Sequence, residues 1–171
     1  MTAYIALLRA VNVGGTGKLP MTELAAMCEA AGFAKVKTYI ASGNVVFTSS
    51  KSEAAVKAAL EKAMEKYAGK PVGVMVRSAA EMAAVGEDNP FADAPGNRVV
   101  AIFLDEAPAK DSIELATNVD GEEMALGKRE IYVRYTDLGM GGSKLKIPAA
   151  KAGTARNMNT VAKLAEMAAD L

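Results

Sequence analysis

The sequence contains no histidine and no tryptophan, and Cys28 is its single cysteine. Without histidine, the chain lacks the commonest general base, the Ser-His and Cys-His nucleophile pairs and the usual zinc ligand sets. One cysteine excludes a disulfide within the chain and is typical of a reducing compartment. We therefore expect a cytoplasmic protein with no metal and no cofactor, whose chemistry, if it has any, uses carboxylates, Lys, Tyr or backbone amides.

Neither sign of charge is in excess, because 20 Lys and Arg residues balance 20 Asp and Glu residues. Nucleic-acid affinity comes mostly from excess basic residues that neutralise phosphates, so this chain is not a general polyanion binder. No apolar run is long enough to span a bilayer, and residues 1–13 lack the basic leader of a signal peptide. With 171 residues, 51% of them hydrophobic, the chain suits one large domain or two small ones.

The first half alternates strand and helix patterns. Apolar residues 4–8 predict a buried strand, residues 20–32 a helix that Gly32 closes, and residues 35–48 a hairpin turning at 42–44. Two capping-box patterns, Ser50 with Glu53 and Ser78 with Glu81, predict the starts of two further helices. A fourth strand is expected over 72–76. The order is βαββαβ, a ferredoxin-like arrangement with both long helices on one face of an antiparallel sheet.

A segment with two prolines and a glycine, residues 89–97, is the best candidate for a linker. We predict a ferredoxin-like domain over 1–88 and a smaller α+β domain over 98–171. The smaller domain reads as βαββα: a strand at 99–104, a helix at 112–117, a hairpin at 124–133, a glycine-rich irregular stretch at 138–153 and a last helix. The whole chain is thus expected to be α+β.

Topology predicts where a ligand would bind. In a split βαβ unit the first and second strands run in the same direction, so the loop after strand one lies beside the hairpin after strand two. This loop is rich in glycine and runs into a helix, and backbone amides in such a loop suit an anion. An equal alternative is a long turn whose glycines supply positive φ. The candidate ligand-binding residues here are Arg9, Asn12, Gly14, Gly15, Lys18, Ser42 and Asn44.

A second candidate runs from Gly141 through Asn157. It carries Lys144, Lys146, Lys151 and Arg156 with no acid among them, and Asn157 opens the last helix. Lysines in a solvated loop need no partner. Arg156 is more informative, because a cation at a helix N-terminus opposes the dipole unless an anion joins it. We add Arg156 and Asn157 to the candidate site, at the edge of a cleft between the two halves. Cys28, on the apolar face of the first helix, is expected to be structural.

Several segments together resemble the bacterial domain-of-unknown-function family 1697. They are residues 4–15, 18–21, 39–47, 76–78, 89–91 and 154–161, in the same order along the chain. The chain departs from the family pattern at Ala10, where a glycine is usual, and at Met158, where a tryptophan is usual. The resemblance implies an α+β fold with a ferredoxin-like first part and supplies no activity.

Three functions compete. The first is a binding module for a small ligand that carries a phosphate or carboxylate group. The second is an enzyme of unknown reaction that uses the same residues, with Lys18 as acid, base or charge stabiliser. The third is a module for RNA or protein interaction, and nucleic acid ranks last because Tyr39 is the one strand aromatic expected to face outward. The sequence does not give the oligomeric state.

Overall fold

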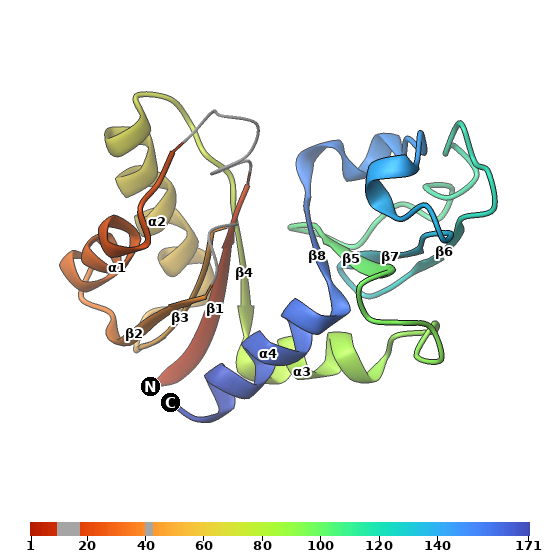
Figure 1. The fold of residues 1–171 in the computed structure, drawn as a ribbon. Helices are drawn as coiled ribbons and strands as arrows, with labels where there is room; N and C mark the ends of the chain where they lie inside the picture. The colour runs from red at the N-terminus through yellow and green to blue at the C-terminus, as the bar shows by residue number, and fades with distance from the viewer. Residues whose placement is uncertain (10–17, 40–42) are drawn as a thin grey trace. The chain divides into compact units, whose positions relative to one another are not determined.

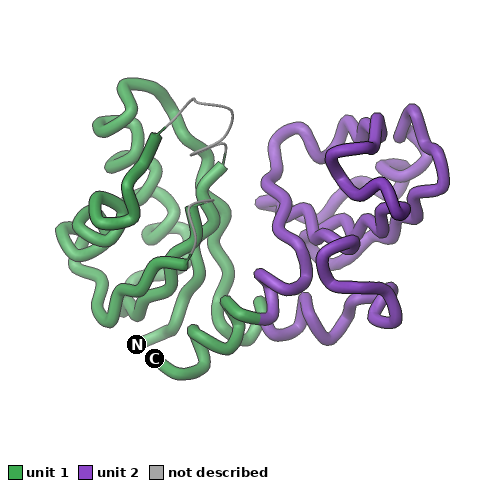
Figure 2. Tube along the Cα trace, in the orientation of Figure 1, with its two compact units in different colours: residues 1–82, 163–171 green, residues 83–162 purple. Residues whose placement is uncertain are grey.

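The computed structural model describes residues 1–9, 18–39 and 43–171. The strands and helices are β1 Thr2–Leu8, α1 Met21–Ala30, β2 Ala34–Tyr39, β3 Asn44–Ser49, α2 Glu53–Ala68, β4 Val74–Ser78, α3 Ala79–Glu87, β5 Val99–Phe103, β6 Glu123–Leu126, β7 Glu130–Arg134, β8 Thr154–Asn157 and α4 Met158–Ala169, with short 3-10 helices at Met140–Gly142 and Pro148–Ala152 (Figure 1). The chain divides into two compact units, residues 1–82 with 163–171 and residues 83–162 (Figure 2). We refer to these as the first and second units.

The first unit contains an antiparallel sheet with the order β2-β3-β1-β4, and β1 lies between β3 and β4. Alternate residues of β1, among them Tyr4 and Leu8, join a core that also holds Leu24 of α1 and Leu60 of α2. Since both helices pack on this one face, the predicted βαββαβ arrangement is confirmed. Phe33 stacks on Phe47 within this core, with ring centroids 4.4 Å apart.

Local sequence explains how the helices of the first unit begin and end. Ser78 and Glu81 form the predicted capping box, because Ser78 N donates to Glu81 Oε1 at 2.9 Å and Glu81 N donates to Ser78 Oγ at 3.2 Å. The other predicted capping pair is displaced. Helix α2 is capped by Ser52, whose Oγ accepts from Ala55 N at 3.2 Å, so the predicted Ser50 cap is wrong.

The second unit contains an antiparallel sheet with the order β6-β7-β5-β8. A core of Val100, Ile102, Leu104, Ile131 and Val133 lies on one face of this sheet. On β7 the hydroxyl of Tyr132 donates to the carbonyl of Val85 at 2.7 Å, which ties α3 to the sheet. The α+β class of the chain is therefore confirmed in both units.

The structure adds one strand to the predicted second half and replaces one predicted helix. Strand β8 pairs with β5, which completes a sheet of the same order as the first. Residues 112–117 were expected to form a helix and instead make turns. Thr117 exchanges two backbone hydrogen bonds with Lys146, at 2.8 and 3.0 Å, so this stretch is drawn into an isolated bridge instead of a continuous helix.

Candidate functional site

Three segments of the first unit meet where β1 ends. Leu8 N donates to Gly43 O at 2.8 Å, which joins β1 to the residue before β3. Arg9 N donates to Gly73 O at 2.9 Å, which joins β1 to the loop between α2 and β4. The predicted neighbourhood of the β1 end and the β2–β3 hairpin is thus confirmed. We call this place the β1 edge, defined by Arg9, Gly43, Asn44 and Gly73.

Arg9 is the exposed cation of the β1 edge. Its side chain lies over Gly73, since a Cβ at Gly73 would be 3.6 Å from both Cβ and Cδ of Arg9. The arginine stem therefore lies along the loop at van der Waals distance from this position. Lys18, also exposed, stands before Leu19, which is buried in the core of the first unit. Residues 1–22 contain both cations and no acid.

Asn44, the first residue of β3, is completely buried. Its Nδ2 donates to the carbonyl of Tyr39 at 3.0 Å across the hairpin, and Gly43 before it has a φ of +87°. The asparagine side chain thus holds the two strands together beneath the turn. Asn12, Gly14, Gly15 and Ser42, which were predicted as ligand-binding residues, lie outside the described residues.

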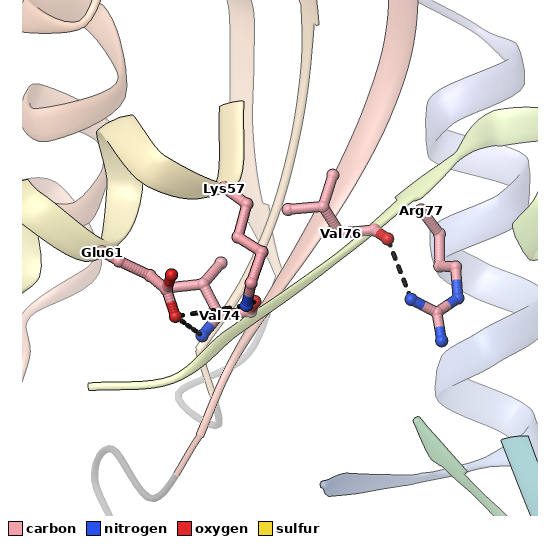
Figure 3. A network of polar contacts seen from close by, with 5 residues as sticks. All are labelled: Lys57, Glu61, Val74, Val76 and Arg77. Atoms are coloured by element: carbon pink, nitrogen blue, oxygen red, sulfur yellow. Dashed lines mark hydrogen bonds and ion pairs between the residues drawn. The ribbon is translucent and has the colours of Figure 1, made fainter. Parts of the chain in front are cut away.

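A lysine and a glutamate of α2 bind the backbone at the outer edge of β4. Lys57 Nζ donates to the carbonyl of Val74 at 2.6 Å, and Val74 N donates to Glu61 Oε2 at 3.4 Å (Figure 3). Lys57 and Glu61 also pair with each other at 3.2 Å. The two side chains therefore offset each other's charge where they meet β4.

Arg77 is a notable residue that the sequence reasoning missed. It is only 1% exposed and is among the largest fully buried side chains. Arg77 pairs with Ile5 across β1, so its side chain lies on the face opposite to Tyr4 and Leu8. Its Nη1 donates to the carbonyl of Val76 at 2.9 Å (Figure 3). The only sequence signal was its place in the 76–78 segment of the family resemblance.

Arg156 lies in strand β8 and not at the start of the last helix, where the sequence placed it. It is 8% exposed, and its Nη1 donates to Thr154 Oγ1 at 2.7 Å and to Ala155 O at 2.9 Å. Burial lowers the pKa of the Arg156 guanidinium from 12.5 to about 10. Asn157 does open α4, because its Oδ1 accepts from Thr160 N at 2.9 Å. Arg9 belongs to the first unit and Arg156 to the second.

The two buried arginines occupy equivalent positions in the two sheets. Leu104 N donates to Arg129 O at 2.9 Å just as Leu8 N donates to Gly43 O. When Leu8 is matched with Leu104 in this way, Ile5 falls on Ala101, and these residues pair with Arg77 and Arg156. Ser78 and Asn157, the residues that follow, each cap the next helix. The second unit is therefore a structural repeat of the first.

The second unit has a pocket of about 400 Å³ beside strands β6 and β7. Two arginines line it, and each has a carboxylate partner. Arg98 Nη1 lies 2.5 Å from Asp137 Oδ1, and Arg134 Nη1 lies 3.0 Å from Glu123 Oε1. An anion entering this pocket would compete with a carboxylate already in place, so the β1 edge is the better candidate for an anionic ligand.

Other chemistry finds little support in the part of the chain that the structure describes. No group of three or more Cys, Asp or Glu side chains there is placed to hold a metal ion. Among these residues, no helix is long and apolar enough to cross a membrane. Cys28 is completely buried, and burial raises the pKa of its thiol from 9.0 to about 12, which agrees with the expected structural role.

Comparison with known proteins agrees with the fold. The conserved bacterial protein SP0830 from Streptococcus pneumoniae, a solved structure, superposes with a TM-score of 0.81 at 28% sequence identity. The match covers 98% of each chain, so it includes both units. Among curated proteins, none matches this sequence. The model of the family described as "Protein of unknown function (DUF1697)" matches residues 1–132. Because this match covers well over half of the sequence, the chain belongs to the DUF1697 family.

Proposed function

We propose that this protein binds a small ligand carrying a phosphate or carboxylate group at the β1 edge of its first unit. The observation that carries the proposal is the position of Arg9, an exposed cation where three segments are joined by backbone hydrogen bonds. A charged group on a rigid framework loses little freedom when it binds, so its hydrogen bonds to an anion contribute more to affinity.

The charges around Arg9 support an anionic ligand. Lys18 is a second exposed cation of the first unit, and the sequence segment 1–22 that holds Arg9 and Lys18 contains no acid. The nearby Glu61 is paired with Lys57 at 3.2 Å and also accepts from Val74 N, so its charge is already matched. The glycine-rich stretch 10–17 connects the two cations along the chain, and its sequence suits an anion-binding loop.

Asn44 supports the proposal indirectly. Its side chain is used inside the hairpin, where it donates to Tyr39 O, and it is completely buried. We therefore assign Asn44 to positioning the hairpin beside Arg9 and reserve direct ligand contact for Arg9 and Lys18. Arg156 and Asn157 stand in the second unit, so the proposal rests on residues of the first.

Thermal melting in the presence of anionic metabolites tests the proposal. The panel holds inorganic phosphate, phosphorylated sugars and nucleotides, and small carboxylates, each beside its uncharged analogue. A ligand that binds only the folded state raises the melting temperature. We expect at least one anionic member to do so and its uncharged analogue not to, with a shift that shrinks as salt is added.

Variants locate the site. Arg9→Gln and Lys18→Gln are each expected to weaken the apparent affinity for the anion at least tenfold, or about 1.4 kcal/mol, and so to reduce the shift in melting temperature. Lys62→Gln is the matched control, because Lys62 is an exposed lysine of α2 outside the β1 edge, and it should leave the shift unchanged. A panel without any anion-dependent shift, or a shift that survives both Arg9→Gln and Lys18→Gln, would refute the proposal.

A further inference from the structure

Three of the four outer sheet edges are protected against pairing with another strand. Side chains occupy three outward backbone groups of β4, since Val74 bonds to Lys57 and Glu61 and the carbonyl of Val76 accepts from Arg77. On β8 the carbonyl of Ala155 accepts from Arg156 in the same way. Side chains that fill the backbone groups of an edge strand prevent strand addition.

Strand β2 is protected by other means. Its register with β3 shifts between Ala34 and Lys37, and Lys35 has a φ of +53°. Lys35 and Lys37 are both exposed on this edge. A bulge and lysines on an edge strand disfavour pairing with a further strand.

Strand β6 has none of these protections. Gly127 N donates to Glu130 O at 2.7 Å, so Ala125 is the next residue whose backbone faces β7, opposite Tyr132. Met124 and Leu126 therefore direct their N–H and C=O groups away from the sheet. Among the described residues, none bonds to these four groups, and β6 pairs with β7 without a register shift.

We propose that β6 pairs antiparallel with β6 of a second copy of this chain, about a twofold axis at Ala125. Met124 of one chain then lies opposite Leu126 of the other, and each such pair exchanges two hydrogen bonds. The two sheets become one continuous sheet across the dimer. Because the strand is short, we expect a reversible dimer whose population depends on protein concentration.

The side chains of β6 suit this pairing. Met124 packs against the core of the second unit, and Leu126, two residues on, lies on the same face but is 37% exposed. In the dimer, Met124 of one copy covers Leu126 of the other. Ala125 of one chain would lie opposite Ala125 of the other in a pair without hydrogen bonds. In such a pair the Cα atoms come within about 4.5 Å, so a small side chain fits best.

The charges at the two ends of the hairpin are complementary. Glu122 and Glu123 stand at the start of β6, and Lys128 and Arg129 form the turn after it. Within the described part of the chain, Lys128 has no ion-pair partner. An antiparallel pairing centred on Ala125 sets Lys128 of one copy opposite Glu122 of the other, on both sides of the axis. Glu122 is 7% exposed and its carboxylate already accepts from Asp120 N and Ser143 Oγ, and neither of these groups is charged, so Lys128 would meet an anion without a cation partner of its own among these contacts. Opposite charges facing across strands favour this register.

The test measures mass and amide exchange over a range of protein concentrations. Light scattering or sedimentation should show the mass of two chains at high concentration and of one chain on dilution. In hydrogen exchange, the amides of Met124 and Leu126 should become protected as the dimer forms, because these are the donors that gain acceptors. A mass of one chain at every concentration would refute the proposal.

Proline substitutions distinguish the edge of β6 from the edge of β2. Leu126→Pro removes an outward N–H and leaves the bonds between β6 and β7 intact, so it should abolish the dimer while the chain stays folded. Leu126→Lys, which places a charge on the edge, should do the same and serves if the proline variant does not fold. Thr38→Pro, an outward position of β2, is the matched control and should still dimerise. The assignment would be overturned if the dimer survived both Leu126 substitutions. It would also be overturned if a peptide or another protein, and not a second copy, protected the amides of Met124 and Leu126.

Discussion

Arg77 and Arg156 illustrate how one residue type solves the same local problem twice. Each lies in an edge strand and donates from Nη1 to the carbonyl of the preceding residue at 2.9 Å. That carbonyl points away from the sheet, so the arginine occupies an acceptor that another strand would otherwise use. Both side chains are less than 10% exposed, and a charge at that depth is costly to bury unless hydrogen bonds or a partner satisfy it. Their hydrogen bonds to the strand offset part of this cost.

At the same scale, Cys28 makes stability depend on pH. The thiol has a pKa of about 12 in the folded chain against 9.0 when exposed. Above pH 9 the unfolded chain therefore loses this proton while the native chain keeps it, so the stability from Cys28 is complete below pH 9 and declines as the pH rises towards 12.

We expect the free energy of urea unfolding to fall with a limiting slope of roughly 1.4 kcal/mol per pH unit from this group. Cys28→Ala should start lower at neutral pH, because it leaves a small cavity, and should fall less steeply above pH 9. Parallel pH dependences of the two proteins would contradict the shifted thiol.

Among the elements, the start of α2 offers a direct test of the structure against a plausible sequence pattern. The helix begins at Glu53, and Ser52 caps it through the bond from Ala55 N. Ser52→Ala should therefore cost about 1 kcal/mol of stability, as the loss of an N-cap does. Ser50→Ala, the matched control, should change the urea midpoint little. A larger loss for Ser50 than for Ser52 would mean that the helix starts two residues earlier.

Elements defined by local patterns were predictable, whereas those defined by distant partners were not. The apolar run 4–8 forms β1, and the capping box of Ser78 and Glu81 starts α3, because both signals lie within a few residues. Strand β8 carries Thr154 and Arg156 at its buried positions, so its sequence lacks the apolar alternation typical of a strand. It is a strand because its backbone pairs with β5. Because distant partners define these strands, the sequence analysis predicted Arg156 at a helix start and did not predict that Arg77 is buried. The meeting of the β1 end with the β2–β3 hairpin was predictable because strand direction alone brings these two segments together, whereas the contact of Arg9 with Gly73 was not predicted.

For the whole molecule, the structural repeat explains why the chain looked one strand short in its second half. The central strands β1 and β5 have the same neighbours in order and register, and each repeat ends in a buried arginine, a cap and a helix. The sequence conceals this because the two repeats use different connections. Helices α1 and α2 join the strands of the first repeat, while turns and short 3-10 helices serve the second.

The end of the chain returns to the first unit, since residues 163–171 belong with 1–82. Leu164 of α4 is completely buried, so Leu164→Ala should cost about 2–5 kcal/mol through lost contacts and a cavity. Hydrogen exchange should then show the loss of protection chiefly in strands β1 to β4, although residue 164 is far from them in sequence.

Leu104→Ala is the matched substitution, because Leu104 is buried in the core of the second unit and its loss should fall on β5 to β8. If Leu164→Ala instead weakened the second sheet and spared the first, the whole of α4 would belong to the second unit. The first unit would then consist of residues 1–82 alone.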